Sequence, residues 1–271
     1  MADSFTRRRF LCGCAIVAAA AAVTPTVASA QSAPASAGPA DGKLVEDLVA
    51  ANRILVDQGV LDAYGHVSVR HDRDPSRYLM SRSLAPELVT AADVMEYDLE
   101  SVPVEPRGRS LYLERFIHGA IYKLRPDVKA IVHHHSPSVI PFGVTTAPLR
   151  PIYHMAAFLG EPTHVFEIRN VGGLTDLLVR NGPLGHALAQ SLGPRNAVLM
   201  RGHGAVVVGP TIVHAVARSV YMEVNARLQA QAMALGPVTY LDPEEARKAE
   251  AAVAGTYGRP WELWKKKALA R

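Results

Sequence analysis

The sequence predicts an α/β fold in which a central mixed sheet lies between layers of helices. Segments with apolar residues at helical spacing alternate along the chain with short apolar or alternating runs typical of strands. The 271 residues are 49% hydrophobic, which is enough to bury a sizeable core. Charged residues make up 20% and are nearly balanced in sign, a composition that argues against bulk disorder.

Helices are expected where apolar residues recur every three or four positions. The segments with this pattern are 43–58, 111–124, 175–192, 211–235 and 242–254. Gly59 and Pro126 end the first two, and Thr175 stands near the expected cap of the third. Asp242 followed by Pro243 marks a helix start, because proline suits the first helical position.

Strands are expected at short runs that alternate in polarity or are wholly apolar. These runs are 65–70, 78–80, 128–133, 163–168, 197–200 and 205–208. An Asp74-Pro75 turn separates the first two, and Arg201-Gly202-His203-Gly204 separates the last two. Since the strands alternate with the helices, we expect a three-layer α/β/α arrangement.

Residues 1–30 have the organisation of a signal peptide of the twin-arginine type. Three arginines at 7–9 precede an alanine-rich apolar stretch at 11–23, and an Ala-Ser-Ala cleavage site follows at 28–30. The apolar stretch is shorter than the roughly 20 residues that span a bilayer, so no stable membrane anchoring is expected. The sequence therefore predicts a periplasmic protein.

The remainder is expected to form one domain. Residues 31–42, rich in Ala, Pro, Ser and Gly, read as a flexible lead-in, and no linker interrupts 43–271. Both cysteines, Cys12 and Cys14, lie in the signal, which excludes disulfides and cysteine-type zinc sites from the mature chain. No dense basic face remains outside the signal, so nucleic acid is not an expected partner.

A buried-type strand ends in three consecutive histidines, which points to a metal site. Successive side chains of a strand face opposite ways, so His133 and His135 share one face and His134 takes the other. His203, between two glycines that permit a sharp turn, offers a third imidazole. Three histidines with an open fourth position are typical of a catalytic metal site. The alternative is that these histidines merely face solvent at a strand end and a turn.

Glu114 stands at the start of an expected helix and is the candidate acid or base. A carboxylate beside a metal can be a further ligand or a general base. The alternative is an ordinary first-turn glutamate that favours the helix dipole. His118 lies one turn later on the same face, and we interpret it as a packed histidine.

Four features in this order resemble the class II aldolase/adducin family, over roughly residues 44–235. They are the strand led by Gly65, the Glu-x-x-x-His helix at 114–118, the strand ending in three histidines, and the Arg-Gly-His-Gly turn at 201–204. Each feature is weak alone, and together they are specific.

The resemblance implies an α/β/α fold of the class II aldolase type with one divalent metal ion per chain, commonly Zn²⁺, while Mn²⁺, Fe²⁺ or Co²⁺ remain open. It implies a homotetramer with active sites near the subunit interfaces. His133, His135 and His203 would be the metal ligands, and Glu114 the catalytic acid or base. The metal would polarise a substrate carbonyl and stabilise the charge left when a carbon–carbon bond breaks.

Departures from the sugar-phosphate members of the family point to a different substrate. His66 replaces an asparagine, Tyr112-Leu113 replaces a serine pair, and Ser81-Arg82-Ser83-Leu84 replaces a Thr-Pro-Ser/Thr-Gly loop. In those aldolases the hydroxyls and glycine amides hold the substrate phosphate. Their loss predicts an unphosphorylated substrate.

We therefore expect a hydroxy-carboxylate, such as a hydroxylated aromatic acid. Arg82 can match a carboxylate with two parallel hydrogen bonds, with Ser83, His66, Tyr112 and His154 as further substrate contacts. The alternatives are a surface role for Arg82 and loop packing for His154. Residues 79–86 resemble the decarboxylase branch of the family, such as dihydroxyphthalate decarboxylases, so the predicted activity is a metal-dependent carbon–carbon lyase, a decarboxylase or an aldolase.

Three other functions remain open at this point. An iron-dependent oxygenase on the same scaffold would use the same three histidines. A sugar or sugar-phosphate aldolase would keep the family chemistry with a different pocket. A non-enzymatic interaction protein like adducin is disfavoured, because adducin-type members lack the metal histidines that this chain has at 133, 135 and 203.

Overall fold

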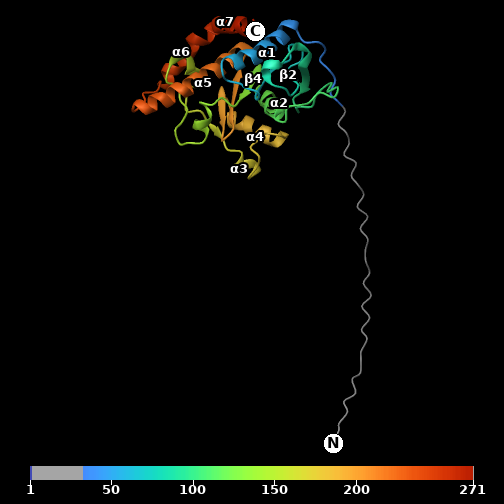
Figure 1. Cartoon of the computed structure of the whole chain (residues 1–271), viewed down its shortest axis with the longest axis horizontal. Helices are drawn as coiled ribbons and strands as arrows, with labels where there is room; N and C mark the ends of the chain where they lie inside the picture. The colour runs from blue at the N-terminus through green and yellow to red at the C-terminus, as the bar shows by residue number, and fades with distance from the viewer. Residues whose placement is uncertain (2–32, 271) are drawn as a thin grey trace. The chain divides into compact units, whose positions relative to one another are not determined.

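A mixed seven-stranded sheet forms the centre of the computed structural model, which describes residues 1 and 33–270 (Figure 1). The order across the sheet is β3-β2-β1-β4-β7-β6-β5, and only the β5–β6 pair is parallel. The strands are β1 (His66–Arg70), β2 (Arg77–Ser81), β3 (Val94–Asp98), β4 (Ala130–His134), β5 (Val165–Phe166), β6 (Ala197–Met200) and β7 (Gly204–Gly209). Residues of the predicted signal peptide other than Met1 lie outside the described part of the chain.

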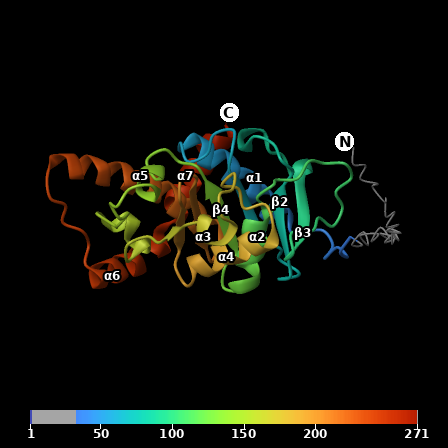
Figure 2. The same cartoon turned by 90° about the horizontal axis from the view of Figure 1, so that it is seen from below.

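Helices cover both faces of the sheet, as Figures 1 and 2 show. The helices are α1 (Gly42–Asp57), α2 (Arg115–Leu124), α3 (Arg169–Gly172), α4 (Gly182–Leu192), α5 (Ile212–Leu235), α6 (Pro243–Val253) and α7 (Gly258–Leu269). α1, α5 and α7 share one apolar core with the sheet, and α2 and α4 share a second. The three-layer α/β/α prediction is therefore confirmed.

The central strand β4 contributes side chains to the apolar cores on both faces of the sheet. Ala130 and Val132 face the core under α1 and α5, and Ile131 between them faces the core under α2 and α4. This period-two alternation, with both faces covered, explains why β4 is apolar along its whole length. His133 and His134 therefore lie at the end of a fully buried strand, and His135 follows directly after it.

Several predicted boundaries need correction. The helix expected from 111 begins at Arg115, and the helix expected from 175 begins at Gly182. Asn181, not Thr175, caps α4, since its side chain accepts a hydrogen bond from the Leu184 N–H at 3.0 Å.

Three of these elements were not predicted at all, namely β3, the short helix α3 and α7. The sheet gains β3, whose alternating Met95 and Tyr97 are buried, and the chain ends in α7, which packs through Trp261 and Trp264.

The other predicted helix starts are confirmed. Thr211 accepts a hydrogen bond from the His214 N–H and caps α5. Asp242 and Glu245 form a reciprocal capping box at α6 with Pro243 in the first turn.

The segment before α1 makes defined contacts with the sheet. The Ser36 hydroxyl and the Ala37 N–H donate to the Glu96 carboxylate on β3, and Arg77 on β2 donates to the Ala35 carbonyl. In the part of the chain that the structure describes, no helix is both long and apolar enough to cross a membrane.

Candidate metal centre

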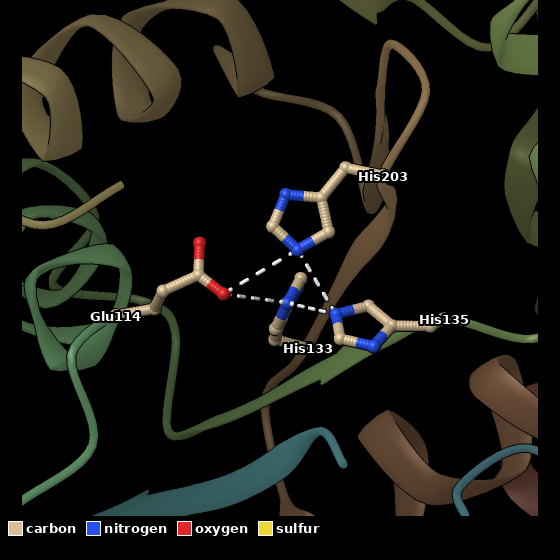
Figure 3. Close-up of side chains that lie close together, drawn as sticks. All are labelled: Glu114, His133, His135 and His203. Carbon is tan, nitrogen blue, oxygen red and sulfur yellow. Dashed lines mark hydrogen bonds and ion pairs between the residues drawn. The ribbon is translucent and has the colours of Figure 1, made fainter. Parts of the chain in front are cut away.

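Three imidazoles and one carboxylate converge at the end of β4 (Figure 3). The possible ligand atoms of Glu114, His133, His135 and His203 all lie within 4.8 Å of one another. The Nε2 of His135 lies 3.0 Å from that of His133 and 2.9 Å from that of His203. Glu114 Oε2 lies 3.4 Å from the Nε2 atoms of both His133 and His203. The structure thus brings together all four residues expected from the sequence.

Strand geometry places the two histidines of β4. His133 belongs to the strand and His135 follows one residue after its end, and both point toward the cluster in Figure 3. Strand alternation places the His134 side chain on the opposite face. Two glycines let the backbone on either side come close. A β-carbon at Gly65 would lie 2.8 Å from the His133 carbonyl oxygen, and one at Gly204 would lie 2.1 Å from that of His134. Any larger residue there would push β1 or β7 away from the site.

His203 and Glu114 come from two other parts of the chain (Figure 3). His203 sits in the tight turn between β6 and β7, where its N–H donates to the Met200 carbonyl at 3.1 Å. Glu114 is the residue just before α2, and its Oε1 accepts a hydrogen bond from the Val179 N–H at 2.9 Å. The other oxygen, Oε2, is left facing the histidines.

The hydrogen-bond pattern of the histidines fits a metal ion. The Nδ1 atoms of His133 and His203 lie 3.1 and 3.0 Å from the carbonyl oxygens of Ala205 and Leu177, and so must carry the proton that each bond needs. In the neutral rings each Nε2 then carries a lone pair, and these lone pairs point toward each other and toward His135. With the imidazoles neutral, at most one proton, on His135, can lie among the three Nε2 atoms. A divalent cation satisfies all three lone pairs and the Glu114 carboxylate at once.

Burial and charge act in opposite directions on these groups. Burial alone would raise the pKa of Glu114, but the adjacent His133 and His203 imidazoles outweigh it and lower that pKa below its usual range. For His203, burial favours the neutral form, yet the adjacent Glu114 raises its pKa overall. Burial, with repulsion from the neighbouring histidines, lowers the pKa of His135 to about 4. Glu114 is therefore ionised and His135 neutral at neutral pH, the forms that bind metal.

A cavity of about 440 Å³ opens directly onto this cluster. Its wall is mostly apolar and includes the rings of Tyr64 and Tyr112. Among the described residues, no lysine or arginine lines it. The full lining is Ala63, Tyr64, Gly65, His66, Ser83, Leu84, Ala85, Tyr112, Leu113, Glu114, His133, His135 and Leu178.

Three of the five residues expected to touch substrate lie on this wall: His66, Ser83 and Tyr112. The His66 ring lies between Tyr112 and His133, with ring centroids 4.6 and 5.0 Å away. The Tyr112 hydroxyl donates to the Leu84 carbonyl at 2.7 Å, which fixes the ring against the cavity.

The structure does not bring Arg82 and His154 to this wall. The Arg82 Nε donates to Asp93 Oδ1 at 2.6 Å, so the guanidinium is held by a carboxylate of the chain itself. His154 lines a separate cavity with Tyr221 and Arg259. The expected carboxylate contact by Arg82 thus has no place in the described cavity.

Other wall residues were missed by sequence reasoning. Tyr64 could have been suspected from its position just before the Gly65-led strand, but Leu178 lies in a segment expected to be helical. His118, expected to be packed, is fully buried and is also hydrogen bonded to His66 and Ser68.

Comparison with known proteins agrees with this geometry. Decarboxylase tropJ from Talaromyces stipitatus is 36% identical over 244 residues, which cover 81% of this chain and 92% of that protein. A 3,4-dihydroxyphthalate decarboxylase from Terrabacter sp. is 30% identical, covering 73% of this chain and 83% of that enzyme. Human beta-adducin is 24% identical over 64% of this chain, but over only 24% of its own length.

Solved structures show the same fold. An L-fuculose 1-phosphate aldolase from Glaciozyma antarctica superposes with a TM-score of 0.69 at 26% identity, covering 85% of this chain and 93% of that one. Residues 46–230 match the family described as the class II aldolase and adducin N-terminal domain, which is more than half of the chain. The chain therefore belongs to the class II aldolase and adducin family.

Proposed function

We propose that this protein is a divalent-metal-dependent carbon–carbon lyase, and specifically a decarboxylase of an unphosphorylated, hydroxylated aromatic acid. Its similarity to enzymes named decarboxylases and aldolases supports a lyase. One observation carries the narrower proposal. Three residues of the metal cluster, Glu114, His133 and His135, line a cavity whose wall is mostly apolar and aromatic.

The chemistry of the wall favours this substrate class over a sugar phosphate. A phosphate needs cationic side chains or a cluster of backbone N–H groups, and among the described residues no cation lines this cavity. The rings of Tyr64, Tyr112 and His66, together with Leu84, Leu113 and Leu178, suit the faces of a planar ring.

The residues divide the work as follows. His133, His135 and His203 would hold the metal ion, which we propose to be Zn²⁺. When bound, the ion supplies chelation of adjacent substrate oxygens and stabilises the negative charge that remains as CO₂ departs. Glu114, with Oε1 held by the Val179 N–H and Oε2 turned toward the cluster, would take a proton from the substrate hydroxyl or return one to the ring.

We further propose a homotetramer and a periplasmic location. Apolar side chains beside the cavity support contact with another copy, because Tyr64 is 69% exposed and Leu113 is 56% exposed. The periplasmic location follows from the signal-like residues 1–30. The mass of the purified protein in solution and fractionation of cells that express the full chain test these two points.

Metal content and CO₂ release test the proposed activity. The mature protein is assayed with 3,4-dihydroxyphthalate, 2,3-dihydroxybenzoate and L-fuculose 1-phosphate, each with and without oxygen. We expect about one zinc ion per chain and oxygen-independent CO₂ release from an aromatic acid. Oxygen consumption with bound iron would favour an oxygenase, and cleavage of the sugar phosphate alone would favour an aldolase.

A His133→Ala/His203→Ala variant should lose both metal and activity. His186→Ala is the matched control, because His186 is exposed on α4 and is not one of the four clustered residues. Native protein that binds no metal even after reconstitution would refute the enzymatic proposal.

A further inference from the structure

Behind the cavity wall, a row of polar groups runs from His66 into the protein interior. His66 Nδ1 lies 2.6 Å from His118 Nε2, and His118 Nδ1 lies 2.6 Å from Ser68 Oγ. Ser68 Oγ in turn lies 2.8 Å from the Tyr122 hydroxyl. We call these three residues behind His66, namely His118, Ser68 and Tyr122, the buried relay. It connects a cavity residue to a group that has no contact with the cavity.

The relay is sealed from solvent. His118 and Ser68 are fully buried, and Tyr122 is 1% exposed. Burial is also the main reason why the pKa of His118 falls to about 3, so its ring is neutral at neutral pH. A neutral imidazole has one N–H donor and one acceptor nitrogen. Each ring in the row must therefore donate on one side and accept on the other.

Counting donors fixes the direction of the row. If His66 Nδ1–H donated to His118, then His118 would donate to Ser68 and Ser68 to Tyr122. The Tyr122 proton would then have no acceptor, because Ser68 is its only hydrogen-bond partner among the described residues. A buried donor without an acceptor is strongly disfavoured.

The opposite direction satisfies every proton. Tyr122 donates to Ser68, Ser68 donates to His118 Nδ1, and His118 Nε2–H donates to His66 Nδ1. The proton of neutral His66 is then on Nε2. No described residue pairs with that nitrogen, and His66 lines the cavity.

We propose that the buried relay fixes His66 as a neutral imidazole that presents its Nε2–H to the cavity, where it donates a hydrogen bond to an acceptor oxygen of the substrate. The class of that substrate rests on the proposed function, but the position of the proton does not. His118, Ser68 and Tyr122 are positioning residues in this scheme.

The inference explains how a cavity without a cationic side chain can recognise an acid. A carboxylate or phenolate oxygen accepts a hydrogen bond, whereas an amine or amide N–H at the same place would face another donor. His66 therefore selects an oxygen acceptor next to the metal cluster, the role first assigned to Arg82.

The test is the position of the His66 proton, which needs no substrate. Zinc-loaded protein with ¹⁵N-labelled histidine is examined by long-range ¹H–¹⁵N correlation NMR, and His66→Asn assigns the His66 signals. We expect a protonated Nε2 and an unprotonated Nδ1. A proton on Nδ1 would overturn the inference even if the protein proves to be a decarboxylase. Conversely, protonated Nε2 without lyase activity would refute only the proposed function.

Ser68→Ala tests whether the relay sets this state. Without the Ser68 hydroxyl, His118 can donate in either direction, and the His66 proton should distribute over both nitrogens. Ser219→Ala is the matched control, because Ser219 is a fully buried serine on α5 whose hydroxyl donates to the Ala215 carbonyl. An unchanged His66 pattern in Ser68→Ala would overturn the role of the relay. The wild-type measurement decides the direction even if this variant does not fold.

Ligand binding tests what the donor does. With 3,4-dihydroxybenzoate as the probe, His66→Leu should weaken binding by roughly 10- to 100-fold, the value of a hydrogen bond to a charged acceptor. His66→Asn keeps an N–H donor and should recover most of this loss. Equal binding by wild type and His66→Leu would show that the Nε2–H contacts no ligand oxygen and would overturn that part of the inference.

Discussion

The two carboxylate oxygens of Glu114 have different partners, which makes a clean variant possible. Oε1 accepts from the Val179 N–H, and Oε2 faces His133 and His203. Glu114→Gln keeps an oxygen for Val179 but cannot exchange a proton. We expect kcat to fall by roughly 10²- to 10⁴-fold while the protein remains folded. Steady-state kinetics and circular dichroism check this.

The control is Glu262→Gln, at an exposed glutamate on α7. Activity of Glu114→Gln within about threefold of wild type would remove Glu114 from proton transfer, since a positioned acid or base contributes at least about 10².

Arg82 and Asp93 form an ion pair that anchors the loop at 83–85, part of the cavity wall. Arg82→Ala should therefore loosen this wall and weaken binding of 3,4-dihydroxybenzoate and of neutral catechol by the same factor. Asp93→Ala should weaken binding at least as much, because it breaks the same pair and also removes the acceptor of the Thr90 hydrogen bonds. Isothermal titration with both ligands measures this, and a loss confined to the carboxylate ligand would return Arg82 to direct contact with substrate.

The metal cluster could be predicted from the sequence because local rules place it. Period-two geometry aligns His133 with His135, and flanking glycines mark His203 as a close turn. The partner of Arg82 could not be predicted in this way. Asp93 comes near only because β2 pairs with β3, and β3 was not expected. A contact that depends on such a strand pairing cannot be read from the residues that surround either partner in the sequence.

At the scale of elements, the packing of α4 against α2 determines where Glu114 lies. Gly185 makes this contact, because a β-carbon there would lie only 2.4 Å from the Phe116 carbonyl oxygen of α2. Gly185→Ala should push the helices apart and lower the free energy of unfolding by about 1–3 kcal/mol. It should also reduce kcat, since α2 begins one residue after Glu114. Urea unfolding and kinetics measure the two effects.

Gly182→Ala is the matched control on the same helix. A β-carbon at Gly182 would meet nothing within 4 Å, so the substitution should leave stability unchanged or raise it by up to about 1 kcal/mol. Equal effects of the two alanines would show that helix propensity, not the α2–α4 contact, determines the result.

The unpredicted elements have physical explanations. Met95 and Tyr97 alternate with half-buried neighbours in β3, a signal that was present in the sequence but short. The segment 175–181 has apolar residues at helical spacing, but Asn181 before Gly182 and Pro183 starts the helix later. The residues before it serve the site instead, since Leu178 lines the cavity and the Val179 N–H holds Glu114. Tertiary contacts there override local propensity.

For the whole molecule, neutral histidines buried between the layers make stability depend on pH. His118 is fully buried, and its pKa is lowered from 6.5 to about 3, mainly by desolvation. The unfolded chain binds a proton at this residue below about pH 6.5, whereas the folded protein does not until about pH 3. The unfolded state therefore takes up more protons in that window, and stability falls as the pH falls.

The expected slope for this one residue is about 1.4 kcal/mol per pH unit between about pH 6 and pH 4. Urea unfolding in the presence of a chelator, followed by the fluorescence of Trp261 and Trp264, gives the free energy of unfolding at each pH. Both tryptophans are buried on α7, so their signal reports loss of the packed layers.

The stability of His118→Leu should depend less on pH than that of wild type, by this slope, whatever its stability at neutral pH. His186→Leu, at an exposed histidine, should keep the wild-type slope. Parallel curves for wild type and His118→Leu would mean that His118 binds its proton equally in the folded and unfolded states. That result would contradict the pKa of His118 lowered by burial, on which the neutral ring in the buried relay depends below about pH 6.5.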